Sequence, residues 1–509
     1  MGHCKICCAD QMIVGRWYKL ITYAVGYDVP YNYTVNYSTS SGNITLLHDT
    51  LYIKEVGEFT VSCVDMYGNS DTKTITAIEK PAIERAEYTI NPTDWLDFQM
   101  KVTEIGSNAL IHVSKGEYAF ELTNMPYTLP SGTVIDFQNS IINITSEVTT
   151  YTGFRIVHDH CGIKNASFVG NMLNDKTYVN TSTVVSIISG DFVDIENLTF
   201  DSLAGFNLTV GAWPSFWHFK PTHKASRWSA SDNVNGYIGV DGNVVSTTEA
   251  WTMGSAVAVV DTPDRSYYVG HSNMWMPSVV RLYDIAFYDS DMNFLELHKD
   301  QQYFRKYYYP ENAAYVRYCV WQESAPVDHS GRDDVCIMRM MAGNAEYQQC
   351  LSVRETWISN IVYKNHASGG ISIVGQCEDI HIDRMLAKGN GWSNGWAFDA
   401  EDGWNSMLGI VVSHSYFAQG SIILHGCQGV SFISCIEGRV TLNSNVHFPT
   451  LINTLNGTIY SYGTRGCATI INSYINRIED TEGNGTVYEF GSRTLAENSD
   501  MRNSIAWYI

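Results

Sequence analysis

The stretch GWSNGWAFDAEDGW at residues 391–404 gathers three tryptophans and three carboxylates, residue types that bind and cut sugars. On an extended strand with a period of two, the apolar side chains from Trp396 to Ala400 point one way. Asp399 and Glu401 then point the other way, outward, at about 7 Å from each other at Cβ. Glycosidases need two carboxyl groups about 5–5.5 Å or about 6.5–9.5 Å apart, so this spacing permits hydrolysis by either stereochemical course.

Nearby residues would complete such a site. Tryptophan rings would stack on sugar faces and would raise the pKa of an adjacent acid by making its surroundings less polar. An acid pair could also form between neighbouring strands. The candidate catalytic residues are therefore Asp399, Glu401, Asp402 and Asp383. The candidate substrate-binding residues are Trp392, Trp396, Trp404, Asp379, Arg384, Trp213, Trp217 and Trp228.

Two other interpretations of this acidic stretch remain open. It could bind a glycan without any chemistry, or Asp402 and Gly403 could simply make a turn of a repetitive fold. Few basic residues stand nearby, and a uronate lyase needs them to neutralise its substrate. Hydrolysis of a neutral glycan is therefore the better enzymatic hypothesis, and whether the chain is an enzyme is left open.

The composition limits the classes of molecule that the chain could bind. The 509 residues carry a net charge of −21, from 32 basic and 53 acidic residues, which opposes nucleic-acid binding. No apolar run is long enough to span a bilayer, and no secretion signal is visible at the N-terminus. The aromatic share of 13% suits flat, hydroxyl-rich partners such as glycans, although β-rich proteins are also rich in aromatic residues.

No cofactor is expected, because no Walker loop, H-E-x-x-H or G-x-S-x-G motif occurs. His3, Cys4, Cys7 and Cys8 form H-C-x-x-C-C, the kind of spacing that could begin a zinc site. No second cysteine pair follows closely. We therefore predict no metal, while zinc at these cysteines stays an open alternative.

An internal repeat is the strongest pattern in the sequence. A six-residue motif recurs five times. It has an apolar residue at position 1, Asn or His at position 3, and Phe, Tyr or Ile at position 6. The copies are IKNASF (163–168), IENLTF (195–200), ISNIVY (358–363), VSHSYF (412–417) and IINSYI (470–475). Such short strands cannot bury their inward face alone, and stacking them closes a core. The Asn is expected to adopt a left-handed conformation and to pair its amide with the next coil. Cys377, Cys427 and Cys467 are expected to be equivalent and to stack inside the core.

A longer segment, VSKGEYAFELTNMPYTLPSGTVIDFQN at 113–139, joins a Gly-x-Tyr strand, a Pro-Ser-Gly turn and an apolar-Asp strand. The residues that carry this order are Gly116, Tyr118, Pro130, Gly132 and Asp136. It resembles the entry coils of pectate-lyase-like bacteriophage tail spikes, over roughly 95–202 and 330–480. The resemblance implies a right-handed parallel β-helix with acids on its flank and a homotrimer.

The predicted fold class is all-β, with five segments. Residues 1–80 would form an Ig-like β-sandwich, 81–94 a linker, and 95–202 the first part of the β-helix. Residues 203–326 would form an inserted jelly-roll-like β-sandwich, resembling the carbohydrate-binding modules of phage tail proteins. Residues 327–509 would complete the β-helix.

This organisation predicts a tail spike or receptor-binding protein of the virion, acting at the host cell surface. It would recognise a bacterial surface polysaccharide and attach to other tail proteins through residues 1–80. A structural or adhesive tail component and a bacterial polysaccharide-degrading enzyme are the alternatives.

Overall fold

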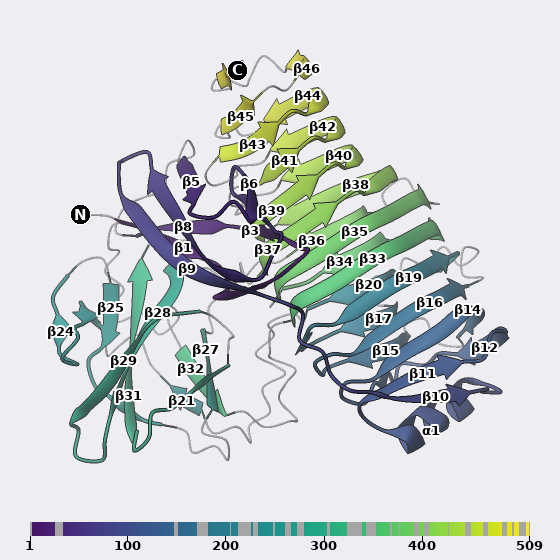
Figure 1. Cartoon of the computed structure of the whole chain (residues 1–509), viewed down its shortest axis with the longest axis horizontal. Helices are drawn as coiled ribbons and strands as arrows, with labels where there is room; N and C mark the ends of the chain where they lie inside the picture. Colours follow the sequence, from purple (N-terminus) through teal and green to yellow (C-terminus); the bar gives the residue numbers. More distant parts are fainter. Residues whose placement is uncertain are drawn as a thin grey trace.

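The computed structural model is an all-β chain with one α-helix in its described part. The structure describes residues 3–25, 34–146, 151–170, 182–203, 205–211, 225–227, 233–247, 250–259, 266–271, 279–302, 306–322, 338–342, 353–366, 369–375, 377–390, 396–401, 407–425, 427–442, 449–461, 467–480, 486–490, 493–497 and 505–507. One sheet of 26 strands dominates the molecule, and smaller sheets lie beside it (Figure 1).

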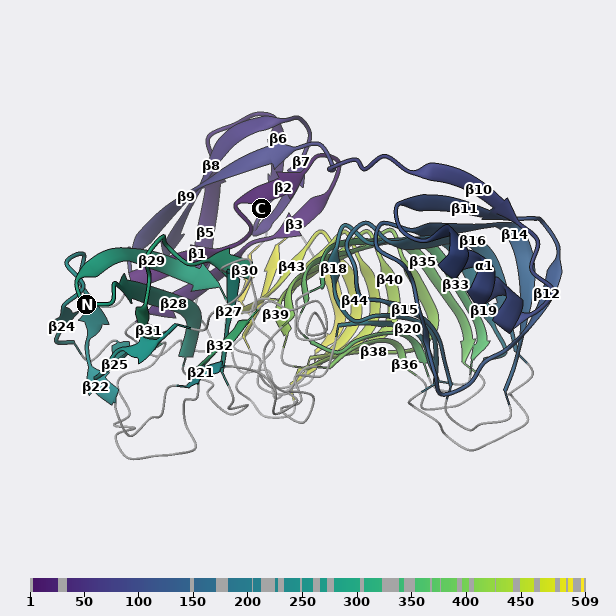
Figure 2. The same cartoon turned by 90° about the horizontal axis from the view of Figure 1, so that it is seen from below.

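The large sheet is built from successive turns of chain that lie on top of one another, and we call it the stack (Figure 2). Its first series of parallel strands comprises β11 (Ala109–Val113), β14 (Val134–Thr145), β16 (Gly162–Val169), β19 (Asp194–Asp201), β33 (Val353–His366), β35 (Cys377–Asn390), β37 (Met407–Ser413), β39 (Cys427–Ile433), β41 (Thr450–Ile452), β43 (Cys467–Ile471), β45 (Thr486–Phe490) and β47 (Ile505–Trp507). Its second series comprises β13 (Tyr127–Thr128), β15 (Thr152–Ile156), β17 (Thr183–Ile187), β20 (Phe206–Val210), β34 (Gly369–Ile373), β36 (Trp396–Glu401), β38 (Tyr416–His425), β40 (Ile436–Leu442), β42 (Leu455–Ser461), β44 (Tyr474–Asp480) and β46 (Arg493–Glu497). The short strands β12 (Glu117–Glu121) and β18 (Gly190–Asp191) pair with β14 and β33.

Residues that share a register position form straight rows through the stack. One inward row runs from β14 to β43 and is apolar at every turn, with each side chain almost fully buried: Ile135, Ile163, Ile195, Ile358, Ile382, Val412, Phe432, Leu451 and Ile470. Because a single turn cannot cover its own apolar face, burial of this row depends on the neighbouring turns.

The repeated Asn or His marks one corner of its turn with a positive φ, as predicted. The backbone φ angle lies between 47° and 59° at Asn165, Asn197, Asn360, His414 and Asn472. Side-chain amides then connect the turns: Asn197 Nδ2 donates to Asn165 Oδ1, and Asn360 Nδ2 donates to Asn197 Oδ1, both at 2.9 Å. Asn tolerates the left-handed region better than most residues, and its amide both donates and accepts, so it suits this corner.

The predicted cysteine alignment is confirmed only in part. Cys377 and Cys427 occupy one row of the stack, with Met407 between them. Cys467 begins β43, and the residues that would link it to the row of Cys427 lie outside the described residues. Its place in the row therefore stays a prediction.

The α-helix α1 (Trp95–Ile105) caps the first turn of the stack (Figure 2). Asp94 begins it by accepting a hydrogen bond from the backbone N–H of Asp97, and Trp95, Phe98 and Val102 are its buried residues. The Trp95 ring lies 5.1 Å from that of Phe120, centre to centre. The preceding segment 81–94, predicted as a linker, contains β10 (Ala86–Ile90), which pairs with β11 as the outermost strand of the stack.

The insertion between β20 and β33 forms separate antiparallel sheets. One holds β21 (Ala225–Arg227), β27 (Ser266–His271), β30 (Lys306–Tyr308) and β32 (Met338–Ala342), and another holds β22 (Asn233–Asn235), β25 (Ala250–Met253), β26 (Val257–Ala258), β28 (Val279–Tyr288), β29 (Phe294–Gln302) and β31 (Tyr315–Gln322). The strands β23 (Tyr237–Ile238) and β24 (Val244–Val245) form a small ribbon. The expected limits of the insertion, 203–326, differ from these: β20 belongs to the stack and β32 to the inserted sheets.

The N-terminal residues fold into three small sheets around their own core, which includes Leu20, Leu51, Val61 and Ile75. The strands are β1 (His3–Cys7), β2 (Gln11–Ile13), β3 (Trp17–Lys19), β4 (Ile21–Val25), β5 (Val35–Thr39), β6 (Ile44–Leu47), β7 (Thr50–Ile53), β8 (Gly57–Asp65) and β9 (Ser70–Ile78). We call residues 3–78 the N-terminal module. It does not extend away from the stack but lies against its later turns (Figure 1).

Buried charges fix one half of that contact. Arg16 Nη1 lies 3.0 Å from Glu355 Oε2, and the Tyr18 hydroxyl donates to the same carboxylate at 2.9 Å. His381 Nε2 is 3.3 Å from Glu355 Oε2, and its ring meets that of Tyr18 edge-on. The Arg16 guanidinium also lies over the ring of Trp357.

The other half of the contact is centred on Lys19, whose side chain is fully buried. Its ammonium lies 2.5 Å from Asp49 Oδ2 and 2.7 Å from Thr450 Oγ1 on β41. The Thr50 and Ser431 hydroxyls hydrogen-bond at 2.7 Å across the same interface. Lys19 and Asp49 pair within the module, whereas Arg16 and Glu355 pair across the interface. The desolvation cost of burying Arg16 and Glu355 is therefore offset only while the two parts stay in contact.

Replacing Asn197 with Ala is expected to destabilise the stack by about 1–2 kcal/mol, because two amide hydrogen bonds are lost and Ala disfavours a positive φ. Urea unfolding followed by circular dichroism measures this loss. Asn197→Gly is the matched control, since it keeps the backbone conformation and removes only the amide. Equal stability of the parent and both variants would show that the ladder contributes nothing.

Acid should weaken the module contact through His381. Burial lowers the pKa of this imidazole below its usual 6.5, against the opposing effect of Glu355. The folded chain therefore keeps His381 neutral where the unfolded chain protonates it, so stability is full above pH 6.5 and falls as the pH drops below it. The slope is at most about 1.4 kcal/mol per pH unit.

The His381→Gln variant isolates the contribution of the imidazole, because Gln stays neutral and can still donate to the Glu355 carboxylate. The free energies of unfolding of the parent and the variant are measured by urea titration between pH 5 and 8. They should converge at low pH. Parallel pH profiles would contradict the assignment.

Candidate functional site

An outward row of polar side chains crosses the first series of the stack, and we call it the flank row. It consists of His112, Asp136, Lys164, Glu196, Ser359, Asp383 and Ser413. The next residues in register, Ile433 and Ile452, are apolar and pack with Trp17 and Leu47 of the N-terminal module. The row is therefore polar up to the turns that the module covers.

Asp383 is the best-connected carboxylate of the flank row. Its Oδ1 accepts from the Ser413 hydroxyl and lies 2.8 Å from His414 Nδ1, while its Oδ2 lies 3.2 Å from Arg384 Nε. The carboxylate is 7% exposed, whereas Arg384 and His414 project from the corner with side chains 58% and 57% exposed.

Arg384 occupies the corner position that Asn takes in neighbouring turns. Its φ is 54°, and its Nε donates to Asn360 Oδ1 at 2.7 Å, so the amide ladder ends on a guanidinium. The rest of the guanidinium faces the solvent beside the His414 ring. The corner thus presents two groups that donate hydrogen bonds to a ligand oxygen.

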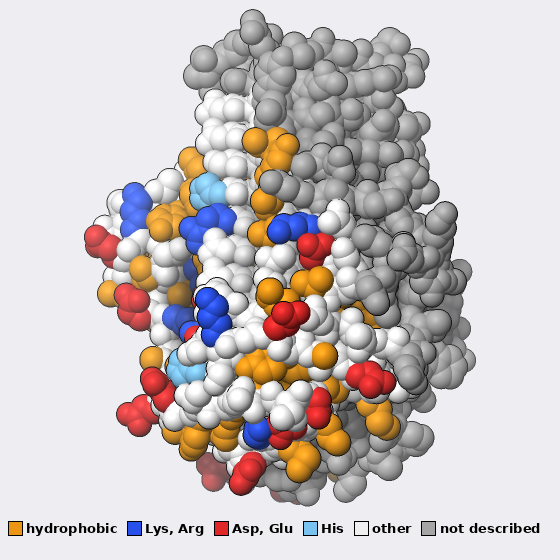
Figure 3. Space-filling model, turned by 90° about the vertical axis from the view of Figure 1, so that its right-hand side faces the viewer, with side chains coloured by type: hydrophobic (Ala, Val, Ile, Leu, Met, Phe, Trp, Pro, Cys, Tyr) orange, Lys and Arg blue, Asp and Glu red, His pale blue; other side chains and the backbone are white. Residues whose placement is uncertain are grey.

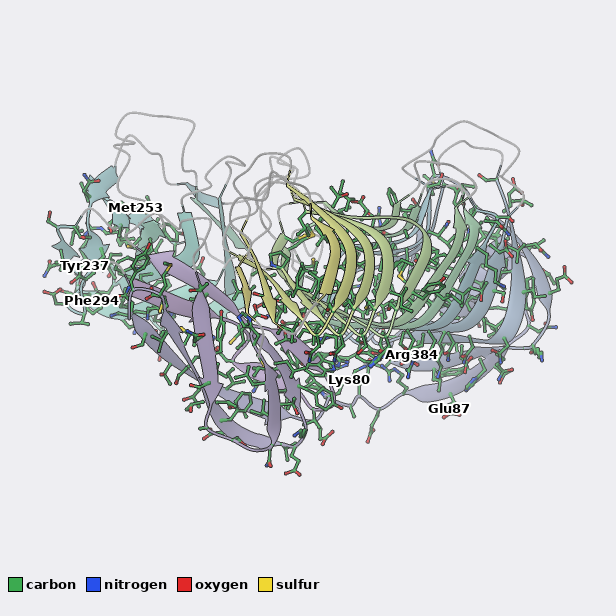
Figure 4. The ribbon with its side chains drawn as sticks, turned by 90° about the horizontal axis from the view of Figure 1, so that it is seen from above. Lys80, Glu87, Tyr237, Met253, Phe294 and Arg384 are labelled. Atoms are coloured by element: carbon green, nitrogen blue, oxygen red, sulfur yellow. The ribbon has the colours of Figure 1, made fainter. Side chains whose placement is uncertain are left out.

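Glu196 lies two turns below Asp383 in the flank row, separated from it by Ser359. Burial raises the pKa of Glu196, and the neighbouring Asp194 raises it further, while Lys164, Lys80 and Arg384 act in the opposite direction. Lys80, in the segment that leads from the module to β10, forms an ion pair with Asp194. Figure 4 shows Lys80 and Arg384 close together on this side of the stack.

Glu196 and Asp383 are the two carboxyl groups that this side of the stack brings within reach of each other. Burial and Asp194 raise the pKa of Glu196, while Asp383 accepts a hydrogen bond from the Ser413 hydroxyl. Two strand spacings separate their Cα atoms by about 10 Å. Carboxyl groups at this interval can reach the wider glycosidase separation of about 6.5–9.5 Å, which leaves room for a water molecule.

The predicted acidic stretch has a different setting. Phe398 and Ala400 lie in the core, as the period of two predicts, but Asp399 is only 6% exposed. Its Oδ2 lies 3.4 Å from the Ser372 hydroxyl on the next strand. The expectation of a solvent-facing Asp399 is therefore wrong, because its side of β36 is covered.

The other predicted site residues divide into two groups. Glu401 and Trp396 are on β36, and only their backbone is described. Six residues lie outside the described residues: Asp402, Trp392, Trp404, Trp213, Trp217 and Trp228. The structure therefore does not test the stacking platform.

Asp379 and Arg384 are not brought together, although both stand on β35. Asp379 has a φ of 54° and is 5% exposed; its charge raises the pKa of Tyr18, after the larger effect of burial. It therefore lies beneath the N-terminal module, while Arg384 projects from the corner into solvent and the buried Asp383 lies behind it. Among the predicted residues whose side chains the structure describes, Asp383 and Arg384 are in contact with each other.

Sequence reasoning missed Glu196 and His414 as site residues, although both stand inside the repeated motif. Glu196 is the middle residue of IEN and Asp383 the middle residue of IDR, so both precede a corner residue with positive φ. Aligning IDRML (382–386) with the repeat would have placed both acids in one outward row.

No group of three or more metal-ligating side chains that could hold an ion occurs in the described part of the chain. In that part, no helix is long and apolar enough to cross a membrane. A scan against protein-family models and a search of curated proteins find no match for the chain.

A carboxyl titration of Glu196 by NMR should give a pKa above the ordinary value of about 4.5. The Lys80→Met variant should raise this pKa further, because the ammonium that stabilises the carboxylate is removed. Lys115→Met serves as the control, since Lys115 is not among the groups that act on Glu196. An ordinary pKa in the parent would remove the basis for an acid role.

Proposed function

We propose that the chain is a bacteriophage tail spike or receptor-binding protein that recognises a bacterial surface polysaccharide. The stack would be a right-handed parallel β-helix, the N-terminal module an Ig-like β-sandwich, and the insertion a jelly-roll-like module. The observation that carries the proposal is the flank row with its corner, where the exposed Arg384 guanidinium and His414 imidazole surround the Asp383 carboxylate on a stack of paired strands. Sugar hydroxyls both donate and accept hydrogen bonds, so they match this mixture.

Hydrolysis of the glycan is the second step of the proposal, and Glu196 with Asp383 would perform it. The protonated Glu196 would donate to the glycosidic oxygen, and the Asp383 carboxylate would activate a water. Arg384 and His414 would position the sugar through its hydroxyls. This pair takes the place of Asp399 and Glu401, because Arg384 and His414 surround Asp383 with exposed side chains that can bind a ligand.

The charge distribution supports a neutral or weakly charged ligand rather than nucleic acid. The net charge is −21, and acidic, basic and hydrophobic side chains are interspersed on the face drawn in Figure 3. A nucleic acid would favour a continuous basic stripe.

A second outward row supports side-by-side assembly, with a homotrimer as the proposed state. It follows the later halves of β14, β16, β19, β33 and β35 into β38 and β40, and includes Ile141, Tyr416 and Ile436, which are 44%, 41% and 44% exposed. Val362 and Leu386 stand between them in the same row. Ser167 and Thr199 interrupt the row after Ile141, and it is then apolar from Val362 to Ile436. This apolar part would fit the same part of a second copy.

Attachment to other tail proteins would use the far end of the N-terminal module. The turn between β8 and β9 exposes Val64, Met66 and Tyr67, and Asp65 holds it by accepting from the backbone N–H groups of Tyr67 and Asn69. In the virion this rigid apolar tip would meet a neighbouring tail protein, while the flank row would act at the host cell surface.

The test is to incubate the purified chain with capsular and wall polysaccharides from candidate hosts, and to measure binding and reducing-end release. We expect the parent to bind one polysaccharide and Arg384→Ala to bind it at least ten times more weakly. If the chain is a hydrolase, Glu196→Gln and Asp383→Asn should each lower the cleavage rate by about 100-fold or more.

An Asp399→Asn variant is the matched control and should cleave like the parent. Binding without release by any protein would assign an adhesin, and the loss of cleavage only in Asp399→Asn would return the site to β36. Failure to bind any polysaccharide would favour a structural tail component instead.

A further inference from the structure

Two buried cysteines of the N-terminal module face each other across its core. Cys4 on β1 and Cys63 on β8 are 1% and 0% exposed, and their sulfur atoms lie 3.6 Å apart. The two residues belong to different sheets, because β1 pairs with β4 whereas β8 lies between β5 and β9. They are 59 positions apart in the sequence, so their contact is a product of the fold.

The distance is short enough for a bond to form with small movements. A disulfide needs about 2.05 Å between sulfur atoms, so the sulfurs must approach by roughly 1.5 Å. Rotation about χ1 of one cysteine moves a sulfur by more than this. Cys4 Sγ also lies 3.3 Å from the carbonyl oxygen of Asn69, to which it can donate.

The thiols are chemically unequal. The hydrogen bond from Cys4 lowers the pKa of the Cys63 thiol, and the same contact followed by burial raises the pKa of Cys4. Cys63 is therefore the sulfur that becomes a thiolate first, and thiolates are the species that oxidants attack. Cys4 then stands in contact with it as the second thiol.

We propose that Cys4 and Cys63 are a modification site that forms a disulfide when the folded chain meets a peroxide. Hydrogen peroxide transfers an oxygen to the Cys63 thiolate, which gives a sulfenic acid and hydroxide. The Cys4 sulfur, on losing its proton to hydroxide, attacks the Cys63 sulfur and expels a second hydroxide, which takes up the proton released when Cys63 ionised. The sum is two thiols and one peroxide giving one disulfide and two waters. This proposal does not rest on the polysaccharide function.

The bond would affect the part of the module that contacts the stack. The loop that it closes contains β3 and β7, hence Tyr18, Lys19 and Thr50 of the buried interface. A cross-link across this loop restricts the unfolded chain, and native contacts in the loop become harder to open. Oxidation would therefore stabilise the contact between module and stack without touching either surface.

The test uses the folded full-length chain treated with a small excess of hydrogen peroxide, blocked with N-ethylmaleimide, unfolded and digested with trypsin without reduction. Cleavage after Lys5 and Lys54 separates the peptide with Cys4 from that with Cys63, and leaves Cys7 and Cys8 on a third peptide. Mass spectrometry should find peptides 1–5 and 55–73 linked. Dithiothreitol added after oxidation should abolish the link.

Cys63→Ala and Cys4→Ala should each give no linked peptide, and Cys161→Ala is the matched control that should keep it. Cys161 is also buried, but its sulfur faces the carbonyl oxygen of Pro130. Oxidation should raise the melting temperature of the parent by several degrees, on the order expected for a cross-linked loop, and should leave Cys63→Ala unchanged. The proposal is overturned if both thiols of the parent stay free after oxidation, or if Cys4 links to Cys7 or Cys8 instead.

Discussion

The rest of the structure depends on one constraint: every turn of chain must return to the same corner one strand spacing above the last. Parallel pairing in a fixed register imposes this, and a residue with positive φ allows the chain to bend there. The corner residue is then surrounded by its equivalents above and below. An Asn amide can donate a hydrogen bond to one of these neighbours and accept one from the other, so Asn165, Asn197 and Asn360 form a ladder.

The same constraint creates the candidate site, because side chains beside the corner become columns with a regular spacing. Glu196 and Asp383 stand far apart in sequence and in the same column in space, and the long insertion between β20 and β33 does not disturb their register. The insertion leaves the stack after one strand and returns at the next, so it changes neither the spacing between neighbouring strands nor the position of the corner. The chain can therefore carry an additional module without loss of the site.

Features that depend on a few neighbouring residues could be predicted from the sequence, and features that depend on contacts between distant residues could not. The left-handed corners were predictable, because Asn or His recurs at a fixed offset from an apolar residue and the conformation is a property of a few residues. The burial of Asp399 was not, since a period of two shows which side of β36 a residue occupies and not what covers that side. The position of the N-terminal module was equally hidden. Its buried pairs join Arg16 to Glu355 and Lys19 to Thr450, and no short window of sequence contains both members.

The buried charges of that contact argue that the module separates from the stack completely or not at all. A partial opening would leave Glu355 without Arg16 in surroundings that water does not yet reach. An unpaired buried charge costs several kcal/mol, far more than the loss of one apolar contact. The intermediate positions are therefore the least stable ones. Lys80 follows the module directly in the sequence and pairs with Asp194 beside Glu196. The docked state of the module therefore also fixes the electrostatic environment of the candidate site.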